Sequence, residues 1–470
     1  MRLTARRVSA LLALAGFPTL AYPQPHFGNG VKVGEVTDSS AILWVRLTAR
    51  SAPDFARMPV FTQGVTEQTR KDAMPEDVLP GCSGEVEIRY WPTNDKTAMT
   101  VLPWQAVLEE RDHTLQTPLS DLLPGTQYAY GVTARGLPQG DGTARISGQF
   151  RTAPLAADDH AVRFFVTTCQ AIGSVDAGAN GHRTYAQMKA LEPDFFVHTG
   201  DFVYYDKVPL ARSMAAARAK WNLMSGYGYL RDFLGAVSAY FMKDDHDTLD
   251  NDCWPGQRYG ELTFAEGQAI FREQVPMGEL PYRTVRWGRH LQIWMTENRD
   301  YRSPNTDPDG PHKTILGPTQ KAWLRQTLLA SDATFKIVIS PGPILGPDKP
   351  GKKDNHSNAT FLHEGDELRA LLAGIPNTYV VCGDRHWQYC SRDPESGLTE
   401  LGCGPINDEH DYGGDPGYDP DWHLYFDSGG GFLEVMVRPD AMTATWFHTD
   451  ASSGDPAFPR IRHQLHFAVQ

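Results

Sequence analysis

The sequence predicts a two-domain protein in which an all-β sandwich of the fibronectin or immunoglobulin type precedes an α/β domain. Three observations lead to this prediction. The chain has 470 residues, more than the roughly 250–300 residues that one hydrophobic core usually serves. Before about Pro154 the apolar residues recur with the two-residue period of strands. After it, strand-like segments alternate with helix-like ones.

The N-terminal domain is expected from short segments in which apolar and polar residues alternate. In one of them Val86, Ile88 and Tyr90 share a face, as in a half-buried strand. A Pro-Gly turn and alternating tyrosines over residues 122–132 resemble the tyrosine corner of fibronectin-type sandwiches, where a Tyr hydroxyl bonds the turn backbone. The predicted strands are 31–36, 41–47, 85–91 and 147–152, and residues 50–80 contain an expected insertion.

The C-terminal domain is expected from apolar strands that alternate with helical segments. Such alternation predicts a layered α/β core with ligands at the carboxyl ends of the strands. The predicted strands are 162–168, 194–199, 238–242, 290–296, 336–340 and 378–382, and the predicted helices are 184–191, 210–234 and 319–330.

The first residues indicate export. Arginines at positions 2, 6 and 7 precede an apolar run and a small-x-small cleavage site that ends at Ala21. The run is too short for a comfortable membrane span. The pair Arg6-Arg7 fits a twin-arginine signal as well as an ordinary secretory one. We therefore expect a signal peptide over 1–21, a sandwich domain over 22–155, a catalytic domain over 156–470, and a periplasmic or secreted protein.

Charge and cysteine content narrow the class further. Forty-four Lys plus Arg against 57 Asp plus Glu give a formal net charge of −13. A sequence-independent nucleic-acid binder would carry the opposite balance. Six cysteines are too few to hold a chain of this length together as a disulfide scaffold. Among them Cys390 and Cys403 are the best candidates for one disulfide.

Four of the predicted strands are followed at once by side chains that bind metal ions. Carboxylates crowded into one cleft repel one another unless cations or protons neutralise them. Oxygen donors suit Ca²⁺, Mg²⁺, Mn²⁺ or ferric iron, and a thiolate with an imidazole favours a transition metal. The residues are Cys169 after the first strand, Asp201 and Tyr204 after the second, Asp244-Asp245-His246-Asp247 with Asn251 after the third, and Asp384 and His386 after the fourth.

Each of these features also has a purely structural interpretation. A Cys at a strand end is usually a small buried residue, a Gly-Asp pair is usually a turn, and an Asp-rich run is often a solvated loop. Their occurrence together, each at the end of an apolar strand, favours a metal site.

The motifs as a set resemble the alkaline phosphatase D (PhoD-like) family of metallophosphoesterases, over nearly all of the mature chain. The resemblance implies a two-layered β-sandwich core with helices outside (α-β-β-α), behind a fibronectin-like domain. It rests on Thr168-Cys169-Gln170, Gly200-Asp201 with Tyr204, Asp244-Asp245-His246-Asp247 with Asn251, Gly383-Asp384-Arg385-His386, and Leu316-Gly317 with Gln320 and Trp323-Leu324.

The resemblance also implies a cluster of Fe³⁺ and Ca²⁺. By this analogy the iron ligands are Cys169, Asp201, Tyr204 and His386. Asp201 bridges to the calcium, which Asn251 and Asp384 also bind. The two cations would activate a water for in-line attack on phosphorus. The family pattern thus predicts an exported phosphohydrolase, an alkaline phosphatase or phosphodiesterase, that acts on a small phosphate monoester, diester or both.

Catalytic and substrate-binding residues are predicted around this cluster. His246 is the candidate for protonating the leaving alcohol or orienting the phosphate, and it also fits a supporting role. The other candidates are Asp245 and Arg385 as catalytic residues and Arg299, Lys352, Lys353 and His356 as cationic groups for the substrate phosphate.

The chain departs from the family pattern at a few positions. Lys243 stands where the family usually has Trp, and Asp247 stands where it has Glu. Glu297-Asn298-Arg299 replaces Asp-Thr-Arg, and Asp250 replaces a frequent Asn. These changes leave the iron ligands intact and alter the calcium surroundings and the substrate pocket.

Two other functions stay open at this stage. The first is a hydrolase with a side-chain nucleophile, either Cys169 or the Ser428 of Asp427-Ser428-Gly429-Gly430, although no Gly-x-Ser-x-Gly elbow or Gly-Lys-[Ser/Thr] loop is present. The second is a non-catalytic surface-binding protein built on the sandwich domain. The sequence predicts no membrane span in the mature chain, no specific nucleic-acid partner and no particular oligomeric state.

Overall fold

The computed structural model describes residues 24–58, 73–137, 142–346, 348–349, 351–411, 419–449 and 459–469. The predicted signal peptide and residues 59–72 of the predicted insertion lie outside the described residues. Within the described ranges, no helix has both the length and the apolar character needed to cross a membrane.

The predicted strands and helices are present in the predicted order, except that the predicted helix 210–234 is two helices. The structure adds elements that were not predicted, among them the strands 114–119 and 283–287, the helices 264–274 and 362–373, and the strands after residue 387. The strands are β1 Val31–Gly34, β2 Ala41–Arg46, β3 Gly84–Pro92, β4 Thr100–Val101, β5 Gln105–Ala106, β6 Thr114–Leu119, β7 Gln127–Gly136, β8 Thr143–Arg151, β9 Val162–Thr167, β10 Phe195–His198, β11 Ser238–Phe241, β12 Arg258–Tyr259, β13 Leu262–Thr263, β14 Arg283–Trp287, β15 Leu291–Met295, β16 Phe335–Ser340, β17 Thr378–Cys382, β18 Gln388–Arg392, β19 Thr399–Cys403, β20 His423–Asp427, β21 Gly431–Val437, β22 Ala441–His448 and β23 Arg460–Ala468. The helices are α1 Arg183–Ala190, α2 Met214–Ser225, α3 Gly228–Leu234, α4 Phe264–Gln274, α5 Gly317–Ala330 and α6 Leu362–Ala373.

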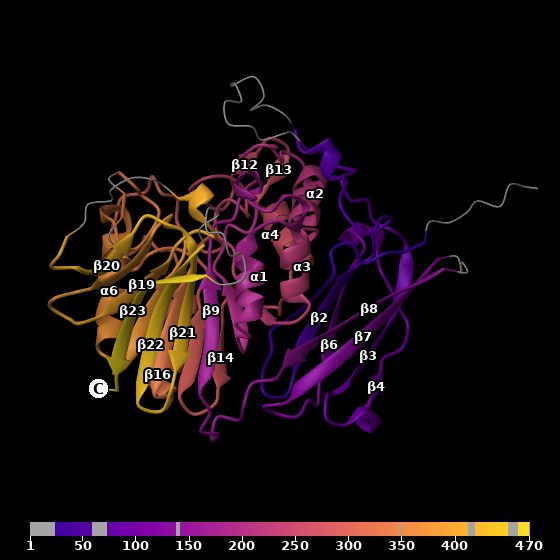
Figure 1. Cartoon of the computed structure of the whole chain (residues 1–470). Helices are drawn as coiled ribbons and strands as arrows, with labels where there is room; N and C mark the ends of the chain where they lie inside the picture. The colour runs from indigo at the N-terminus through magenta and orange to yellow at the C-terminus, as the bar shows by residue number, and fades with distance from the viewer. Residues whose placement is uncertain are drawn as a thin grey trace, which may run out of the picture.

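Two large sheets pack face to face to form the centre of the molecule (Figure 1). Among the described residues, one sheet has nine strands in the order β23-β22-β21-β9-β10-β11-β1-β2-β6. The other has seven, in the order β14-β15-β16-β17-β19-β18-β20. Helices α1 to α4 cover the outer face of the first sheet, and α5 and α6 cover the outer face of the second. The layers are therefore α-β-β-α, as predicted.

The alternation of residues along β9 and β10 builds this arrangement. Phe164 and Phe195 point into the core between the two sheets, while Phe165 and Phe196 point to the helices on the outer side. Because strands buried on both faces need apolar residues at every position, they appear in the sequence as continuous apolar runs. Strands β9, β10 and β11 are parallel, so their carboxyl ends meet at one edge.

The N-terminal segment forms a second β-sandwich. Strands β1, β2 and β6 pack against a five-stranded sheet in which β4, β3, β7 and β8 are neighbours and β5 pairs with β3. The hydroxyl of Tyr128 accepts a hydrogen bond of 2.8 Å from the backbone N–H of Leu123. The tyrosine corner predicted from residues 122–132 is therefore present.

The two sandwiches share a sheet, which the sequence did not indicate. Strand β1 lies parallel to β11 through the pair Gly34 and Ala239, so three strands of the N-terminal sandwich extend the nine-stranded sheet. Below this junction, Arg46 on β2 pairs with the Asp112 carboxylate at 2.8 Å. The same carboxylate accepts hydrogen bonds from Asn222 on α2 and Gln274 on α4. One partly buried carboxylate thus connects the N-terminal strands to two helices of the catalytic domain.

The predicted disulfide between Cys390 and Cys403 is wrong. All six cysteines lie within the described residues, and all are thiols. Strands β18 and β19 are antiparallel neighbours, and their register sets Cys390 opposite Leu401 and Cys403 opposite Gln388. The two thiols are therefore not opposed to each other across the strand pair.

Replacing Asp112 with Asn tests the connection between the two sandwiches. Asn fits the left-handed backbone at this position, which has a φ of 50°, but it leaves the buried Arg46 charge unpaired. We expect the free energy of unfolding to fall by about 3–5 kcal/mol in urea titrations. The control is Asp54→Asn, since the Asp54 pair with Arg50 is exposed and is expected to contribute about 0.5 kcal/mol or less. Equal effects of the two substitutions would contradict this account.

Candidate metal centre

The loops after β9, β10, β11 and β17 meet at one edge of the central sheets. Two glycines permit this approach. A Cβ at Gly200 would lie 2.7 Å from the Asp244 Cβ, and a Cβ at Gly383 would lie 2.4 Å from the Thr199 Oγ1. Neither position therefore has room for a side chain. The Gly-Asp pairs at positions 200 and 383 bring the candidate ligands together as well as turning the chain.

Three of the candidate ligands have a left-handed backbone. The φ angles are 48° at Cys169, 57° at Asp201 and 61° at Asp384. This conformation costs roughly 1–2 kcal/mol for a residue that carries a Cβ, and such costs concentrate at functional sites. Each left-handed residue lies just beyond its strand, where the turn directs the side chain to the shared edge.

The four residues predicted to bind iron form two contacting pairs, and Cys169 packs against Tyr204 to connect the pairs. The Cys169 thiol donates to the Asp201 carboxylate at 3.4 Å, and the Tyr204 hydroxyl lies 3.3 Å from His386 Nε2. Burial raises the pKa of the Cys169 thiol well above its usual value, and the negative charges of Asp201 and Asp384 raise it further. Without a cation the thiol stays protonated, so a metal ion would be needed to hold it as a thiolate.

Sequence reasoning missed His410, which belongs to the same group of side chains. Its Nε2 lies 2.9 Å from the Tyr204 hydroxyl, and its ring centroid lies 4.4 Å from that of His386. His410 sits in a short 3-10 turn after β19 and has no apolar strand directly before it. The signal used for the other ligands, a polar residue at a strand end, was therefore absent.

A second group of ligand atoms surrounds the other side of Asp201. Ligand atoms of Asp201, Asp245 and His246 all lie within 4.8 Å of one another, and all three residues are buried. His246 Nδ1 lies 2.7 Å from the Asp206 carboxylate, which fixes the ring orientation. Burial lowers the pKa of His246, but the carboxylates of Asp245, Asp201 and Asp206 outweigh it and raise the value to about 10.

The acidic groups carry more negative charge than their surroundings neutralise. Burial raises the pKa of Asp201 well above its usual value despite the nearby His246. Burial also raises the pKa of Asp244 to about 8 and that of Asp247 to about 7. In addition, Asp201 Oδ1 is buried without a hydrogen-bond partner among the described residues. A bound cation would satisfy that oxygen and stabilise the ionised carboxylates, so the residues present fit a metal centre.

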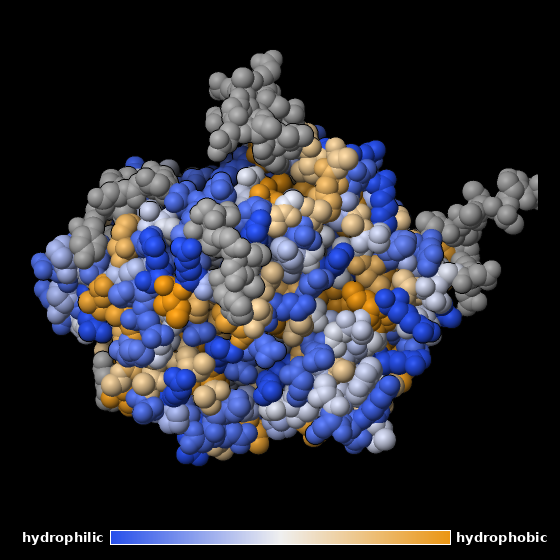
Figure 2. Space-filling view, in the orientation of Figure 1, coloured by the Kyte–Doolittle hydropathy of each residue, from blue (hydrophilic) through white to orange (hydrophobic). Residues whose placement is uncertain are grey.

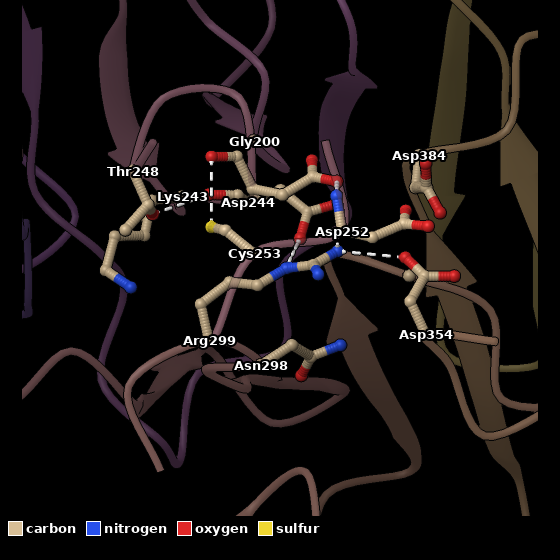
Figure 3. A network of polar contacts seen from close by, with 12 residues as sticks. Gly200, Lys243, Asp244, Thr248, Asp252, Cys253, Asn298, Arg299, Asp354 and Asp384 are labelled. Carbon is tan, nitrogen blue, oxygen red and sulfur yellow. Dashed lines mark hydrogen bonds and ion pairs between the residues drawn. The ribbon is translucent and has the colours of Figure 1, made fainter. Parts of the chain in front are cut away.

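Arg299, predicted to bind substrate, is instead paired with carboxylates of the protein. Figure 3 shows its guanidinium between Asp244 and Asp354, at 2.5 Å and 3.3 Å. The side chain is 2% exposed. One nitrogen, Nη1, has no partner among the described residues. The contacts of Arg299 therefore position the acidic loop after β11.

Arg385 and Lys352 are also paired with carboxylates. Arg385 lies 2.5 Å from Asp384 and 3.0 Å from Asp348, and Lys352 lies 2.5 Å from Asp252. Each of these cations stands beside the cluster with its charge balanced by the protein, and their predicted catalytic and substrate-binding roles stay predictions.

Three predicted residues are not joined to the cluster by the described contacts. Asn251 is exposed, and its backbone N–H donates to Asp206 at 3.1 Å. His356 is buried and directs Nε2 to Glu364 at 3.0 Å, toward helix α6. Lys353 is exposed and makes no described contact with the ligands. The prediction that His356 binds substrate thus finds no support in its contacts.

Two departures from the family pattern compensate each other. The Lys243 ammonium lies 2.5 Å from Glu297 and 2.5 Å from Asp300, and all three side chains are almost fully buried. A buried cation needs a carboxylate partner. The Lys at position 243 and the Glu at position 297 are therefore explained together as one ion pair beneath the cluster.

Two buried carboxylates hold the loop that follows β16. Glu400 accepts hydrogen bonds from the backbone N–H groups of residues 344, 345 and 346 at 2.7–2.9 Å. Glu364 accepts from His356, from the Thr314 hydroxyl and from two backbone N–H groups. The loop between them carries Asp348, Lys352 and Asp354, so these two contacts fix the cations and carboxylates beside the metal centre.

The pH dependence of stability tests the role of Glu364. Burial raises its pKa, but the bonds from His356, Thr314 and Ile315 outweigh it and lower the value to about 2. A depressed carboxylate pKa stabilises the fold above the unfolded value near 4.5 and loses this contribution as the pH falls toward 2. Glu364→Gln is therefore expected to lower the free energy of unfolding by about 3 kcal/mol at pH 7, with a smaller difference at pH 3.

The control for this measurement is Glu367→Gln on the same helix, because Glu367 is exposed and pairs with Lys321. It is expected to change stability by about 0.5 kcal/mol or less. Both are measured by urea unfolding at each pH. A deficit in Glu364→Gln that stays constant from pH 7 to pH 3 would show that lost packing, and not the carboxylate charge, explains it.

Comparison with known proteins concerns the fold and the family. A search of curated proteins gives no match. Among solved structures, one described as PhoD superposes with a TM-score of 0.73 at 17% identity, covering 96% of this chain and 92% of the other. The purple acid phosphatase PPD1 from yellow lupin (Lupinus luteus) seeds superposes with a TM-score of 0.62 at 12% identity, covering 93% and 74%. At these identities the similarity concerns the fold, and it confirms the predicted architecture.

Sequence profiles of known families identify the family of this chain. The profile of the N-terminal domain of PhoD-like phosphatases matches residues 13–154, and the PhoD-like phosphatase profile matches residues 164–420, more than half of the chain. This chain belongs to the PhoD-like phosphatase family of metal-dependent phosphohydrolases.

Proposed function

We propose that this protein is an exported phosphodiesterase whose metal centre is held by Cys169, Asp201, Tyr204 and His386. The observation that carries the proposal is a connected set of contacts at the ends of buried strands: the thiol with the carboxylate, the phenol with the imidazole, and the thiol against the phenol. Beside them, the acidic group of Asp201, Asp245 and His246 supplies further ligand atoms.

Fe³⁺ and Ca²⁺ are the proposed metals. A thiolate and an imidazole favour a transition metal, and a phenolate suits ferric iron, whereas carboxylate oxygens alone suit Ca²⁺. We propose Asp201 as the shared ligand and Asp384 as a calcium ligand. Asp245 is proposed in the place first predicted for Asn251, because its carboxylate oxygen is the one beside Asp201. When bound, the two ions would supply an activated water and polarise a phosphoryl oxygen.

His246 is the proposed proton donor to the leaving alcohol. Its Nδ1 is held by Asp206 at 2.7 Å, so Nε2 is the nitrogen available to a substrate. The tilted packing of the His246 ring on Tyr204, with centroids 4.3 Å apart, restrains the ring further. A donor held on both sides needs no reorganisation when the P–O bond breaks.

The charge balance around the centre favours diesters over monoesters. A phosphate monoester carries roughly −1.5 to −2 charges near neutral pH, whereas a diester carries one. Arg299, Arg385 and Lys352 are all paired with carboxylates of the protein. Lys207 differs from these three cations, because its ammonium lies over the Tyr204 ring, 3.9 Å from the ring centre. Beyond the two proposed metal ions, the described side chains around the centre add few uncompensated cations, which suits the single charge of a diester.

Export to the periplasm or the medium is part of the proposal. It rests on the basic and apolar segment that ends at Ala21. The twin-arginine route is favoured by the centre itself, because that route carries proteins that have already folded around their metals.

Kinetics on matched substrates test the reaction and its dependence on metal. We expect bis(p-nitrophenyl) phosphate to be hydrolysed with a higher kcat/KM than p-nitrophenyl phosphate. Prolonged treatment with a strong chelator should abolish both activities. In Asp201→Asn, elemental analysis should show loss of bound metal, and kcat/KM should fall by more than about 100-fold.

The control for this variant is Glu409→Gln, because Glu409 is an exposed carboxylate near the centre. It should retain metal and activity. Activity that survives chelation would favour a side-chain nucleophile, and a purified protein with neither metal nor activity would favour a surface-binding role for the sandwich domain.

The visible spectrum tests the assignment of iron. A phenolate or thiolate bound to Fe³⁺ absorbs visible light by charge transfer, so the holoprotein is expected to be coloured. In Tyr204→Phe the absorption band should disappear or shift. The control is His410→Gln at a neighbouring ring, in which a tyrosinate band should stay in place. A band unchanged in Tyr204→Phe and shifted in Cys169→Ser would assign the colour to the thiolate instead.

A further inference from the structure

A hollow lies on the outer face of the N-terminal five-stranded sheet, on a different part of the fold from the metal centre. Its volume is about 650 Å³, within the range of ligand-binding pockets. Strands β3, β7 and β8 form its floor, and residues between β3 and β5 form one wall. In Figure 2 the surface at this end of the molecule is mainly blue and pale, as expected of polar residues.

The alternation of β3 separates the hollow from the sandwich core. Val86, Ile88 and Tyr90 are buried in the core, so Glu87, Arg89 and Trp91 point to the outer face. A Trp on the solvent face of a sheet buries little surface in the fold itself. The same face carries a second Trp, at position 104, and both line the hollow. Such rings are enriched at binding surfaces because they provide a large apolar face at a low entropy cost.

Cations surround both rings. Arg89, Lys96, Arg135 and Arg145 line the hollow, and Glu87 is the acidic residue among the described lining. Arg89 and Arg135 each pair with a carboxylate, so Lys96 and Arg145 are the lining cations without a described ion pair. Their excess positive charge is unusual in a chain with a net charge of −13. An anionic ligand is therefore the charge complement of this hollow.

Packing and ion pairs hold several of these groups in place. The Arg135 guanidinium stacks on the Trp104 ring at 4.1 Å, and the Lys96 ammonium lies 5.4 Å from the Trp91 ring. Arg89 pairs with Glu87 at 2.6 Å, and Arg135 pairs with Glu85. Held side chains lose less entropy when a ligand binds.

A glycine keeps the floor of the hollow open. Gly131 on β7 stands between Arg89 on β3 and Ser147 on β8, and a Cβ at this position would meet no atom within 4 Å. Its φ lies outside the left-handed region, so the backbone does not require glycine. Glycine weakens a strand interior and often marks a place where a ligand approaches the backbone.

We propose that this hollow binds a segment of an acidic polysaccharide. The apolar C–H faces of sugar rings pack on Trp, and their acidic groups pair with the arginines. Hydroxyls of Thr133 and Ser147, which also line the hollow, would bond the sugar hydroxyls. The hollow therefore matches an acidic polysaccharide in its apolar surfaces and in its charge.

A nucleic-acid strand fits the same surface less well. It carries a charge at every nucleotide, which the Glu87 carboxylate in the hollow and the negative charge of the whole chain oppose. An acidic polysaccharide with neutral sugars between its acidic ones meets less repulsion. This binding would hold the protein on an acidic polysaccharide independently of its phosphatase activity.

The test uses the full chain and hyaluronate oligosaccharides, in which acidic and neutral sugars alternate. The uncharged methyl ester of the same oligosaccharides is the matched ligand, and an oligothymidylate of similar length is the nucleic-acid probe. We expect calorimetric titration to show binding of hyaluronate, at least about tenfold weaker binding of the ester, and weaker binding of oligothymidylate.

Two variants locate the binding. Trp104→Ala should weaken hyaluronate binding by about 30-fold, the effect of truncating a central aromatic contact. Gly131→Leu should weaken it by at least about tenfold, because its side chain fills the floor of the hollow. The control is Gly278→Leu, an exposed glycine that also has open space at its Cβ and a φ outside the left-handed region. All three variants should keep the phosphatase activity of the parent.

Four outcomes would overturn the proposal. They are the absence of hyaluronate binding, equal binding of the ester, tighter binding of oligothymidylate, and unchanged binding in Gly131→Leu. Because phosphatase activity is measured separately, failure here leaves the proposed reaction standing, and loss of the reaction leaves this result standing.

Discussion

Neutralisation of buried carboxylates is the constraint on which the rest of this structure depends. The strand ends bring Asp201, Asp244, Asp245 and Asp384 into one cleft, where water cannot screen their repulsion. On one side Arg299 and Arg385 supply the opposite charge from within the protein. On the other side the charge is left uncompensated, and Asp201 Oδ1 has no partner among the described residues. The side with the arginines is therefore neutralised by the protein itself, whereas the side with Asp201 is the candidate for binding a metal ion.

The same constraint explains why the surrounding loops are held so firmly. An acidic cluster that must stay assembled needs its counter-charges in fixed positions. The loop after β16 brings Lys352 and Asp354 to the cleft. Buried Glu400 binds the loop backbone at one end, and buried Glu364 binds the His356 side chain at the other. Beneath the cluster, Lys243 and Glu297 change the residue types that are usual in the family and form one buried ion pair, in which Asp300 is a second carboxylate partner of Lys243. Two substitutions that look independent in the sequence are one interaction in the fold.

The N-terminal sandwich is part of the catalytic layer as well as a domain beside it. Its first strands continue the nine-stranded sheet, and Asp112 ties Arg46 to helices α2 and α4. Its other sheet faces away from this junction and carries the hollow with Trp91 and Trp104. The domain thus has one face committed to the catalytic domain and one face available to a ligand. The charge of that hollow is opposite to the charge of the chain, whereas the metal centre is acidic like the chain as a whole.

The sequence by itself determined most of the central strands, their order and the candidate ligands at their ends. Apolar runs marked the strands, and the polar residues just after them marked Cys169, Asp201, Tyr204 and His386, because a strand end in an α/β layer is a fixed place in space. Tertiary structure alone decided which side chains from distant segments come into contact. His410 reaches Tyr204 from a segment without a strand before it, His356 turns to Glu364, and the register of β18 and β19 keeps Cys390 and Cys403 apart. Local sequence sets backbone conformation through short-range sterics and periodicity. Pairing between distant side chains depends on register and on the approach of loops, which no single segment encodes.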